Sequence, residues 1–169
     1  MRYRRALPED APAVMAVVQA GFETYRAYAP PDWEPPDETR DEEIQRGRAE
    51  LADPQTTAYV AEDGGRVIGH VRIVRAVAPS PDGTTPDWHF RHLFVLEPYW
   101  GTGVAKALHD LAVRDLVGTA RLYTPEPQAR ARRFYEREGW QLHHGPHGAA
   151  GFPFALVEYR LTGQSPRSG

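Results

Sequence analysis

Residues 93–108, LFVLEPYWGTGVAKAL, constrain the fold of this chain more than any other stretch. An apolar strand over residues 93–96 ends at Glu97-Pro98, and an amphipathic helix is expected to begin near Gly103 or Val104. The first backbone N–H groups of a helix have no intrahelical partner, and glycines carry no side chain to keep an anion away. The stretch therefore predicts an anion cradle. Walker A and GxGxxG spacings are both absent, so a loop that only turns the chain is the alternative.

Composition excludes several classes of protein. The chain has 169 residues, which favours a single domain. A net charge of −3 argues against a nucleic-acid binder. The chain contains 0 cysteines, which excludes disulfides, thiolate zinc sites and a cysteine nucleophile. No signal peptide or apolar run of about 20 residues is present, so we expect a cytoplasmic protein without a membrane partner.

Hydrophobic periodicity and turn residues divide the chain into alternating elements. Strands are expected at residues 3–6, 57–62, 67–76, 88–96, 121–124, 140–143 and 154–161, and helices at about 10–25, 38–51, 104–111 and 127–138. This order predicts an α/β fold, with a mixed sheet covered by helices on both faces. We expect one domain over residues 1–162 and a flexible tail over 163–169.

Two separated motifs in this order resemble the GCN5-related N-acetyltransferase (GNAT) family. In this chain the run Trp100-Gly101-Thr102-Gly103-Val104-Ala105 is similar to the family's first motif, except that the family has Gln or Arg where Trp100 stands. The family's second motif has Asn where Gln128 stands in this chain. The rest of that motif is matched by Ala131, Phe134-Tyr135 and Gly139-Trp140. The resemblance covers residues 2–161.

The resemblance implies a single-domain, mostly antiparallel sheet that splays between its fourth and fifth strands. It also implies an N-acetyltransferase that moves an acetyl group from acetyl-CoA to a primary amine of a small molecule or peptide. The alternative is a non-catalytic acyl-CoA-binding sensor or scaffold of the same fold, in which Trp100 and Gln128 mark lost catalysis. The acyl chain and the oligomeric state stay open, a homodimer included.

The family's cofactor contacts map onto two parts of this chain. By resemblance, backbone groups of three strand residues hold the pantetheine arm, and the glycine loop with the following helix start surrounds the pyrophosphate. These residues are Leu93, Phe94 and Val95, followed by Gly101, Thr102, Gly103, Val104, Ala105 and Lys106. Gln128 is expected to hydrogen-bond pantetheine with its amide. Trp100 either stacks beside the ligand or packs, and Lys106 either neutralises phosphate or is a solvated surface charge.

Two side chains are candidates for proton transfer. By resemblance Tyr135 is the general acid that protonates the leaving thiolate, and the alternative is an aromatic pair with Phe134 in the core. His89 is the candidate base for the attacking amine, against a structural or surface role. Strict alternation along the strand places His89 on one face and His92 on the other. The Val95 N–H is the candidate donor to the thioester oxygen.

The acceptor residues are predicted from composition alone. Acidic residues crowd residues 32–43 beside four candidate pocket walls, Tyr25, Tyr28, Trp33 and Trp88. This combination suits a cationic amine, while a solvated acidic helix start is the alternative. His143, His144 and His147 are expected in a mobile loop at the acceptor entrance. No metal is expected, because no nearby carboxylate completes a site there.

Overall fold

The computed structural model describes residues 1–164 of the chain. The described residues form seven strands, four α-helices and three short 3₁₀ helices. In chain order these are β1 (Arg2–Arg5), η1 (Pro8–Asp10), α1 (Ala11–Glu23), η2 (Thr24–Ala27), α2 (Asp41–Ala52), β2 (Thr57–Asp63), β3 (Arg66–Arg75), β4 (Trp88–Val95), η3 (Glu97–Tyr99), α3 (Val104–Val113), β5 (Thr119–Pro125), α4 (Ala129–Arg137), β6 (Gln141–His147) and β7 (Leu156–Thr162). The predicted order of strands and helices is confirmed.

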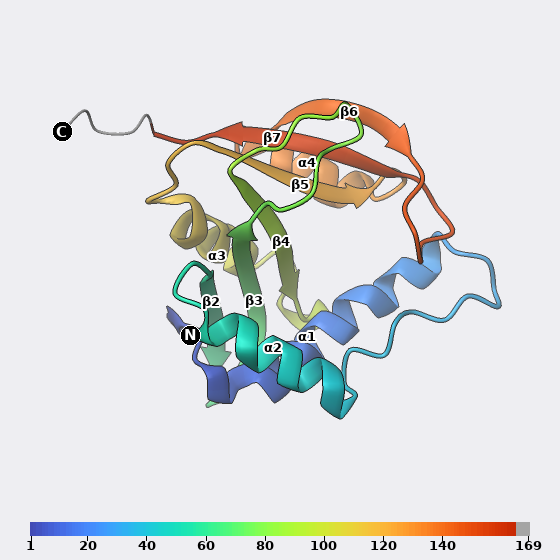
Figure 1. The fold of residues 1–169 in the computed structure, drawn as a ribbon. Helices are drawn as coiled ribbons and strands as arrows, with labels where there is room; N and C mark the ends of the chain where they lie inside the picture. Colours follow the sequence, from blue (N-terminus) through green and yellow to red (C-terminus); the bar gives the residue numbers. More distant parts are fainter. Residues whose placement is uncertain (165–169) are drawn as a thin grey trace.

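The seven strands form one sheet in the order β1-β2-β3-β4-β5-β7-β6. All neighbours are antiparallel except β4 and β5, which are parallel. Helices α1 and α2 pack on one face and α3 on the other, and α4 lies beside β5–β7 (Figure 1). Two apolar clusters fill these layers, one around Val14, Val18 and Val60 and one around Leu108, Leu122 and Tyr159. The predicted mixed α/β fold with helices on both faces is confirmed.

Strands β4 and β5 separate soon after they meet. They pair only at Trp88↔Ala120 and His89↔Arg121. Beyond these residues β4 continues with β2 and β3, while β5 follows β7 at a large angle, as Figure 1 shows. The edge of β4 from Phe90 onward therefore lacks a partner strand on one side, and its backbone groups are available to a ligand.

A β-bulge in β4 corrects the predicted alternation of that strand. Arg72 of β3 pairs with His92, but the next residue, Ile73, pairs with Phe90, so Arg91 is an extra residue. Such an insertion shifts the alternation by one residue, so side chains on either side of the bulge no longer follow a strict in-and-out pattern. Phe90 consequently packs against Trp140 in the α3-side core, whereas His92 contacts Phe22 of α1. His89 and His92 were predicted on opposite faces, and with the extra residue between them they lie on the same face.

The predicted boundaries near the C-terminus also change. Residues 141–147 form strand β6 rather than a mobile loop. Of the predicted tail, Gly163 donates its N–H to the Gly118 carbonyl at 2.7 Å and Gln164 donates to the Leu116 carbonyl at 2.9 Å. The rest of that tail lies outside the described residues. Within residues 1–164, every helix is too short or too polar to cross a membrane.

Candidate active site

Two adjoining cavities lie along β4. The larger, of about 790 Å³, fills the space between the splayed strands and is bounded by the glycine loop, α3 and α4. The smaller, of about 240 Å³, lies between β4 and the helices α1 and α2. Both cavities are lined by the same five residues at their junction, Tyr25, Arg91, His92, Phe94 and Tyr123. A ligand in one cavity can thus meet a ligand in the other.

The glycine loop adopts a conformation that favours glycine at two positions. Gly101 has φ = 78° and Gly103 has φ = 89°, both in the left-handed region. A Cβ added at either glycine would meet no protein atom within 4 Å, so the backbone conformation sets the requirement. Gly103 is the N-cap of α3, and the amides that follow it are the unpaired first N–H groups of that helix. The loop and helix start line the larger cavity with backbone donors.

The register of β3 and β4 decides which strand residues offer backbone groups to the larger cavity. The Leu96 N–H bonds the Ile68 carbonyl at 2.9 Å, so Leu93 and Val95, opposite Val71 and Gly69, occupy non-hydrogen-bonded positions. Groups at such positions point away from the paired strand. Leu93 and Val95 therefore direct theirs toward the cavity, whereas the backbone of Phe94 faces β3. Phe94 lines both cavities with its ring.

Trp100 contacts both β4 and α4, the two elements on either side of the larger cavity. Its indole Nε1 donates to the Val95 carbonyl at 2.7 Å, which occupies one acceptor on the open edge of β4. The guanidinium of Arg130 on α4 lies 3.9 Å from the centre of the ring, a cation–π contact. Trp100 also lines the larger cavity and is exposed, so both predicted alternatives, packing and stacking beside a ligand, stay open.

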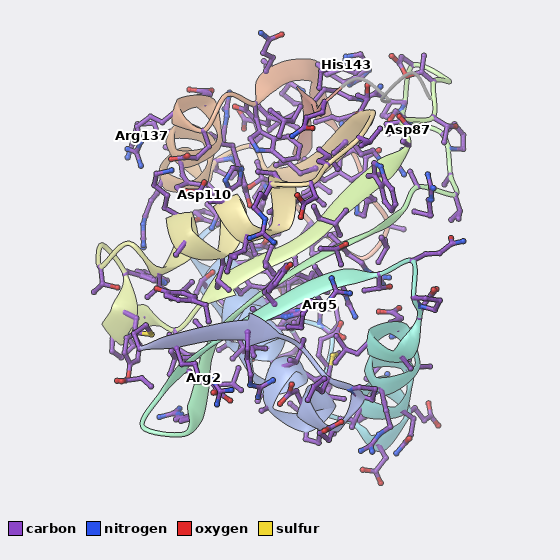
Figure 2. The ribbon with its side chains drawn as sticks, turned by 90° about the vertical axis from the view of Figure 1, so that its left-hand side faces the viewer. Arg2, Arg5, Asp87, Asp110, Arg137 and His143 are labelled. Carbon is purple, nitrogen blue, oxygen red and sulfur yellow. The ribbon has the colours of Figure 1, made fainter. Side chains whose placement is uncertain are left out.

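Cationic side chains gather on the α4 side of the larger cavity. Arg130, Arg133 and Arg137 line it, and the sequence analysis did not single them out. Their positions 130, 133 and 137 follow helical spacing, which was the available signal. Figure 2 shows Arg137 on the same side of the molecule as Asp110 of α3. Lys106, which was singled out, is held by Asp110 at 2.8 Å and Glu138 at 3.0 Å.

Two motif residues on and before α4 also line the larger cavity. The amide oxygen of Gln128 accepts the Thr124 hydroxyl at 3.2 Å, which leaves its NH₂ group to face a ligand. Burial raises the pKa of the Tyr135 hydroxyl, so this group stays protonated at neutral pH. It makes no hydrogen bond with any residue between 1 and 164. A protonated phenol without a protein partner is suited to donate a hydrogen bond to a ligand.

His89 lines the smaller cavity and is a neutral imidazole. Burial, with the nearby Arg121 guanidinium, lowers its pKa to about 3. Arg121 Nε donates to His89 Nδ1 at 3.2 Å, so the remaining proton of the ring is on Nε2. This arrangement makes His89 a weak proton acceptor at neutral pH.

A family model described as "Acetyltransferase (GNAT) family" matches residues 18–140, which span both motifs, α3 and α4. The chain belongs to the GNAT acetyltransferase family. No curated protein sequence matches it significantly.

Solved structures share the GNAT fold at low sequence identity. An acetyltransferase described as "histone acetyltransferase HPA2 and related acetyltransferase" from Corynebacterium glutamicum is 18% identical, with a TM-score of 0.70 over 98% of this chain and 97% of its own. An acetyltransferase from Thermus thermophilus is 17% identical, with a TM-score of 0.63 over 95% and 97%. PaiA N-acetyltransferase from Thermoplasma acidophilum, solved in complex with coenzyme A, is 13% identical, with a TM-score of 0.64 over 93% and 96%.

The predicted acceptor residues of this GNAT protein divide into two groups. Tyr25 and Tyr28 line the larger cavity, and Tyr25 also lines the smaller one. Trp33 and Trp88 line neither. The Trp33 indole donates to the Gly151 carbonyl at 3.4 Å, and the Trp88 indole donates to the Val117 carbonyl at 2.8 Å. As pocket walls, these two tryptophans are replaced by Phe22, Phe94 and Phe152.

The acidic run is mostly engaged outside the cavities. Glu34 pairs with Arg26 at 2.5 Å, and Glu43 pairs with Arg40 and Arg46. Glu38 lines the smaller cavity, where Glu50 of α2 joins it. Three arginines, Arg46, Arg72 and Arg91, line the same cavity. Of the predicted acidic run, only Glu38 lines this cavity, and the fold brings cationic side chains from other elements to the same place.

The described histidines and carboxylates make ion pairs in the two places that could suggest a metal. His143 has a carboxylate partner after all, since Asp82 lies 2.7 Å from its Nε2, and Figure 2 shows His143 at the outer strand β6. His109, Asp110 and Glu138 lie close enough to one another for an ion. The Lys106 ammonium already bridges the two carboxylates of that cluster.

Proposed function

We propose that the protein transfers an acetyl group from acetyl-CoA to a primary amine of a small molecule or peptide. The observation that carries the proposal is the meeting of the two cavities at β4, one lined by backbone donors and one by side chains. PaiA N-acetyltransferase, which has the same fold, binds coenzyme A, and this supports placing the cofactor in the larger cavity. Bound acetyl-CoA supplies the thioester.

The residues of the larger cavity fit the parts of that cofactor. The N–H groups of the glycine loop and α3, with Arg130, Arg133 and Arg137, would hold phosphates. The free backbone groups of Leu93 and the amide of Gln128 would hold the pantetheine amides. The Val95 N–H would polarise the thioester carbonyl. The Tyr135 hydroxyl would donate its proton to the sulfur.

The amine loses a proton before it attacks, because its lone pair is needed for the new bond. The lowered pKa of His89 gives little support to that residue as the base. Glu38 lines the same cavity, and its carboxylate forms no ion pair with the part of the chain that the structure describes. We propose Glu38, acting through water, as the proton acceptor, and His89 as a group that orients the amine.

A panel of amines tests the proposal through release of the free coenzyme A thiol. We expect thiol release with at least one small amine, with the acetylated product identified by mass spectrometry. The alternative is a non-catalytic sensor of acyl-CoA, which the departures at Trp100 and Gln128 would allow. Tight binding of coenzyme A, measured by calorimetry, together with no thiol release across the panel would favour that alternative.

A further inference from the structure

The smaller cavity is lined by three guanidinium groups and two carboxylates, those of Arg46, Arg72, Arg91, Glu38 and Glu50. Arg72 pairs with Glu50, and Arg91 pairs with the other oxygen of the same carboxylate at 3.0 Å. One carboxylate therefore faces two guanidinium groups. His89 and His92 beside them do not offset this, because neutral imidazoles add no negative charge.

Arg72 is unusual for a cation in a protein interior. It is 1% exposed, and its Nη2 lies 3.1 Å from His92 Nδ1. Its Nε is buried and has no hydrogen-bond partner among the described residues. Arg72 lines the smaller cavity, so its guanidinium lies at the wall of the space in which an acceptor would bind. Buried polar groups in folded proteins are nearly always hydrogen-bonded, and a ligand is one way to meet that need.

We propose that the acceptor is an amine that also carries a carboxylate, and that Arg72 and Arg91 bind this carboxylate. The inference deepens the proposed acetyl transfer and rests on it. Guanidinium groups match a carboxylate with paired N–H donors, and a desolvated site strengthens the contact. The amine of the same molecule would then lie toward the junction of the cavities, where Arg91 and His92 border both.

The other residues that line the smaller cavity indicate the size and polarity of the rest of the acceptor molecule. Beside the charged residues, the cavity is lined by apolar or aromatic side chains, and five of these come from four different parts of the chain: Met15, Phe22, Phe94, Phe152 and Leu156. The volume of about 240 Å³ is small for a ligand site and suits a molecule of metabolite size. An amino acid with an apolar side chain is the simplest compound with all three properties. The walls would not cover a long peptide or a polyamine.

Matched pairs of substrates test the inference on the intact protein. Phenylalanine, leucine and methionine are each compared with their amides, which keep the amine and the side chain but lose the carboxylate. Because charged hydrogen bonds are lost, we expect kcat/KM to be about tenfold or more lower for the amides. The α-amine of an amino-acid amide is less basic than that of the free acid, so more of it is neutral and ready to attack. This difference favours the amides, and a preference for the acids is therefore informative.

Variants of Arg91 connect the preference to the site, because this exposed side chain can be changed with little risk to folding. Arg91→Gln should raise the KM for phenylalanine about tenfold and leave the KM for phenylalaninamide within about twofold. Arg91→Lys should restore part of the preference, since it keeps the charge. Arg48→Gln on α2 is the matched control, because Arg48 is exposed and lines neither cavity. Arg72→Gln serves as a second variant if its thermal unfolding remains cooperative.

Calorimetric binding of phenylalanine and its amide, in the presence of coenzyme A, separates the inference from the proposed function. Equal turnover of acids and amides would overturn the carboxylate inference and leave acetyl transfer intact. Binding of the acid alone, without thiol release from acetyl-CoA, would support the carboxylate site and count against acetyl transfer. Failure of the acids to bind at all, while other amines are acetylated, would also overturn the inference.

Discussion

The larger and smaller cavities are built in opposite ways from the same strand. The larger one presents backbone groups of residues close in sequence, at Leu93, Val95 and the loop from Gly101 to Gly103. The smaller one presents side chains from α1, α2, β3, β4 and the loop before β7, such as Arg72, Glu50 and Phe152. The difference teaches that a local motif can reveal a site made of main chain, whereas the chemistry of a pocket assembled from distant side chains follows from the fold.

Tyr135→Phe should produce the largest effect of these variants, because it should lower the rate of acetyl transfer far more than the affinity for coenzyme A. Loss of a general acid typically lowers kcat by about 100-fold or more. Coenzyme A affinity should stay nearly unchanged, because the contacts proposed for it in the larger cavity are mainly backbone groups and arginines. Thiol release measures the first quantity and calorimetry the second.

Tyr59→Phe is the control for that variant. Tyr59 lies on β2, lines neither cavity and carries the Arg5 guanidinium 5.7 Å from its ring centre. Equal kcat for wild type and Tyr135→Phe would contradict the proposed proton donor and strengthen the sensor alternative.

Gly21→Ala tests whether the wall between the cavities can be moved. A Cβ on this α1 residue would overlap the ring of Phe94, so the ring must shift. We expect a destabilisation of about 1–3 kcal/mol from overpacking, together with a raised KM for the acceptor. Chemical unfolding and acceptor kinetics measure both effects.

Gly145→Ala is the matched glycine substitution, since a Cβ there meets nothing within 4 Å. Should Gly21→Ala keep wild-type acceptor kinetics, Phe94 would not shape the acceptor cavity.

Gly103→Ala probes the main chain of the larger cavity. At φ = 89° an alanine is strained by about 1–2 kcal/mol, and relief of that strain would turn the amides at the start of α3. Coenzyme A affinity should fall about tenfold if this strain is relieved at the expense of the bound geometry.

Gly65→Ala at φ = 79° in the β2–β3 hairpin is the control, because it carries similar strain outside both cavities. Equal losses of coenzyme A affinity in the two variants would show a general stability effect instead of a role for the loop.

Acid should destabilise the α1 side of the sheet, where His70 is buried. Burial lowers its pKa from 6.5 to about 3, so the unfolded state binds more protons below pH 6.5. The stabilisation is complete above that pH and is lost as pH falls toward 3, by roughly 1 kcal/mol per pH unit for one such histidine. Urea unfolding at several pH values measures the slope.

His70→Asn should reduce the slope without abolishing it, because asparagine does not titrate in this range while burial also lowers the pKa of His89 and of His92. A slope unchanged by His70→Asn would place the acid-sensitive group elsewhere.

Most of the fold and the larger cavity could be predicted from the sequence. Apolar periodicity located the helices and strands to within a few residues, and the two motifs marked the glycine loop and α4. The β4 bulge could not be predicted, because Arg91 looks like any other strand residue until its pairing with β3 is known. That single extra residue turns His92 to the face of α1.

The charged residues that line the smaller cavity could not be predicted from the sequence either. The sequence places seven acidic residues between Asp32 and Glu43, a local excess that suggested a cationic substrate. The structure engages several of them with nearby arginines and brings Arg72 and Arg91 to the cavity from two adjacent strands.

The sequence by itself determined the order of elements, the family and the main-chain cradle at Gly101 and Gly103, because these depend on periodicity and on backbone conformations set by neighbouring residues. Only the tertiary structure decided which side chains face the acceptor. That choice depends on strand register, on the bulge at Arg91 and on how α1 and α2 pack over β3 and β4. Contacts of this kind join residues far apart in the chain, and local sequence carries little information about them.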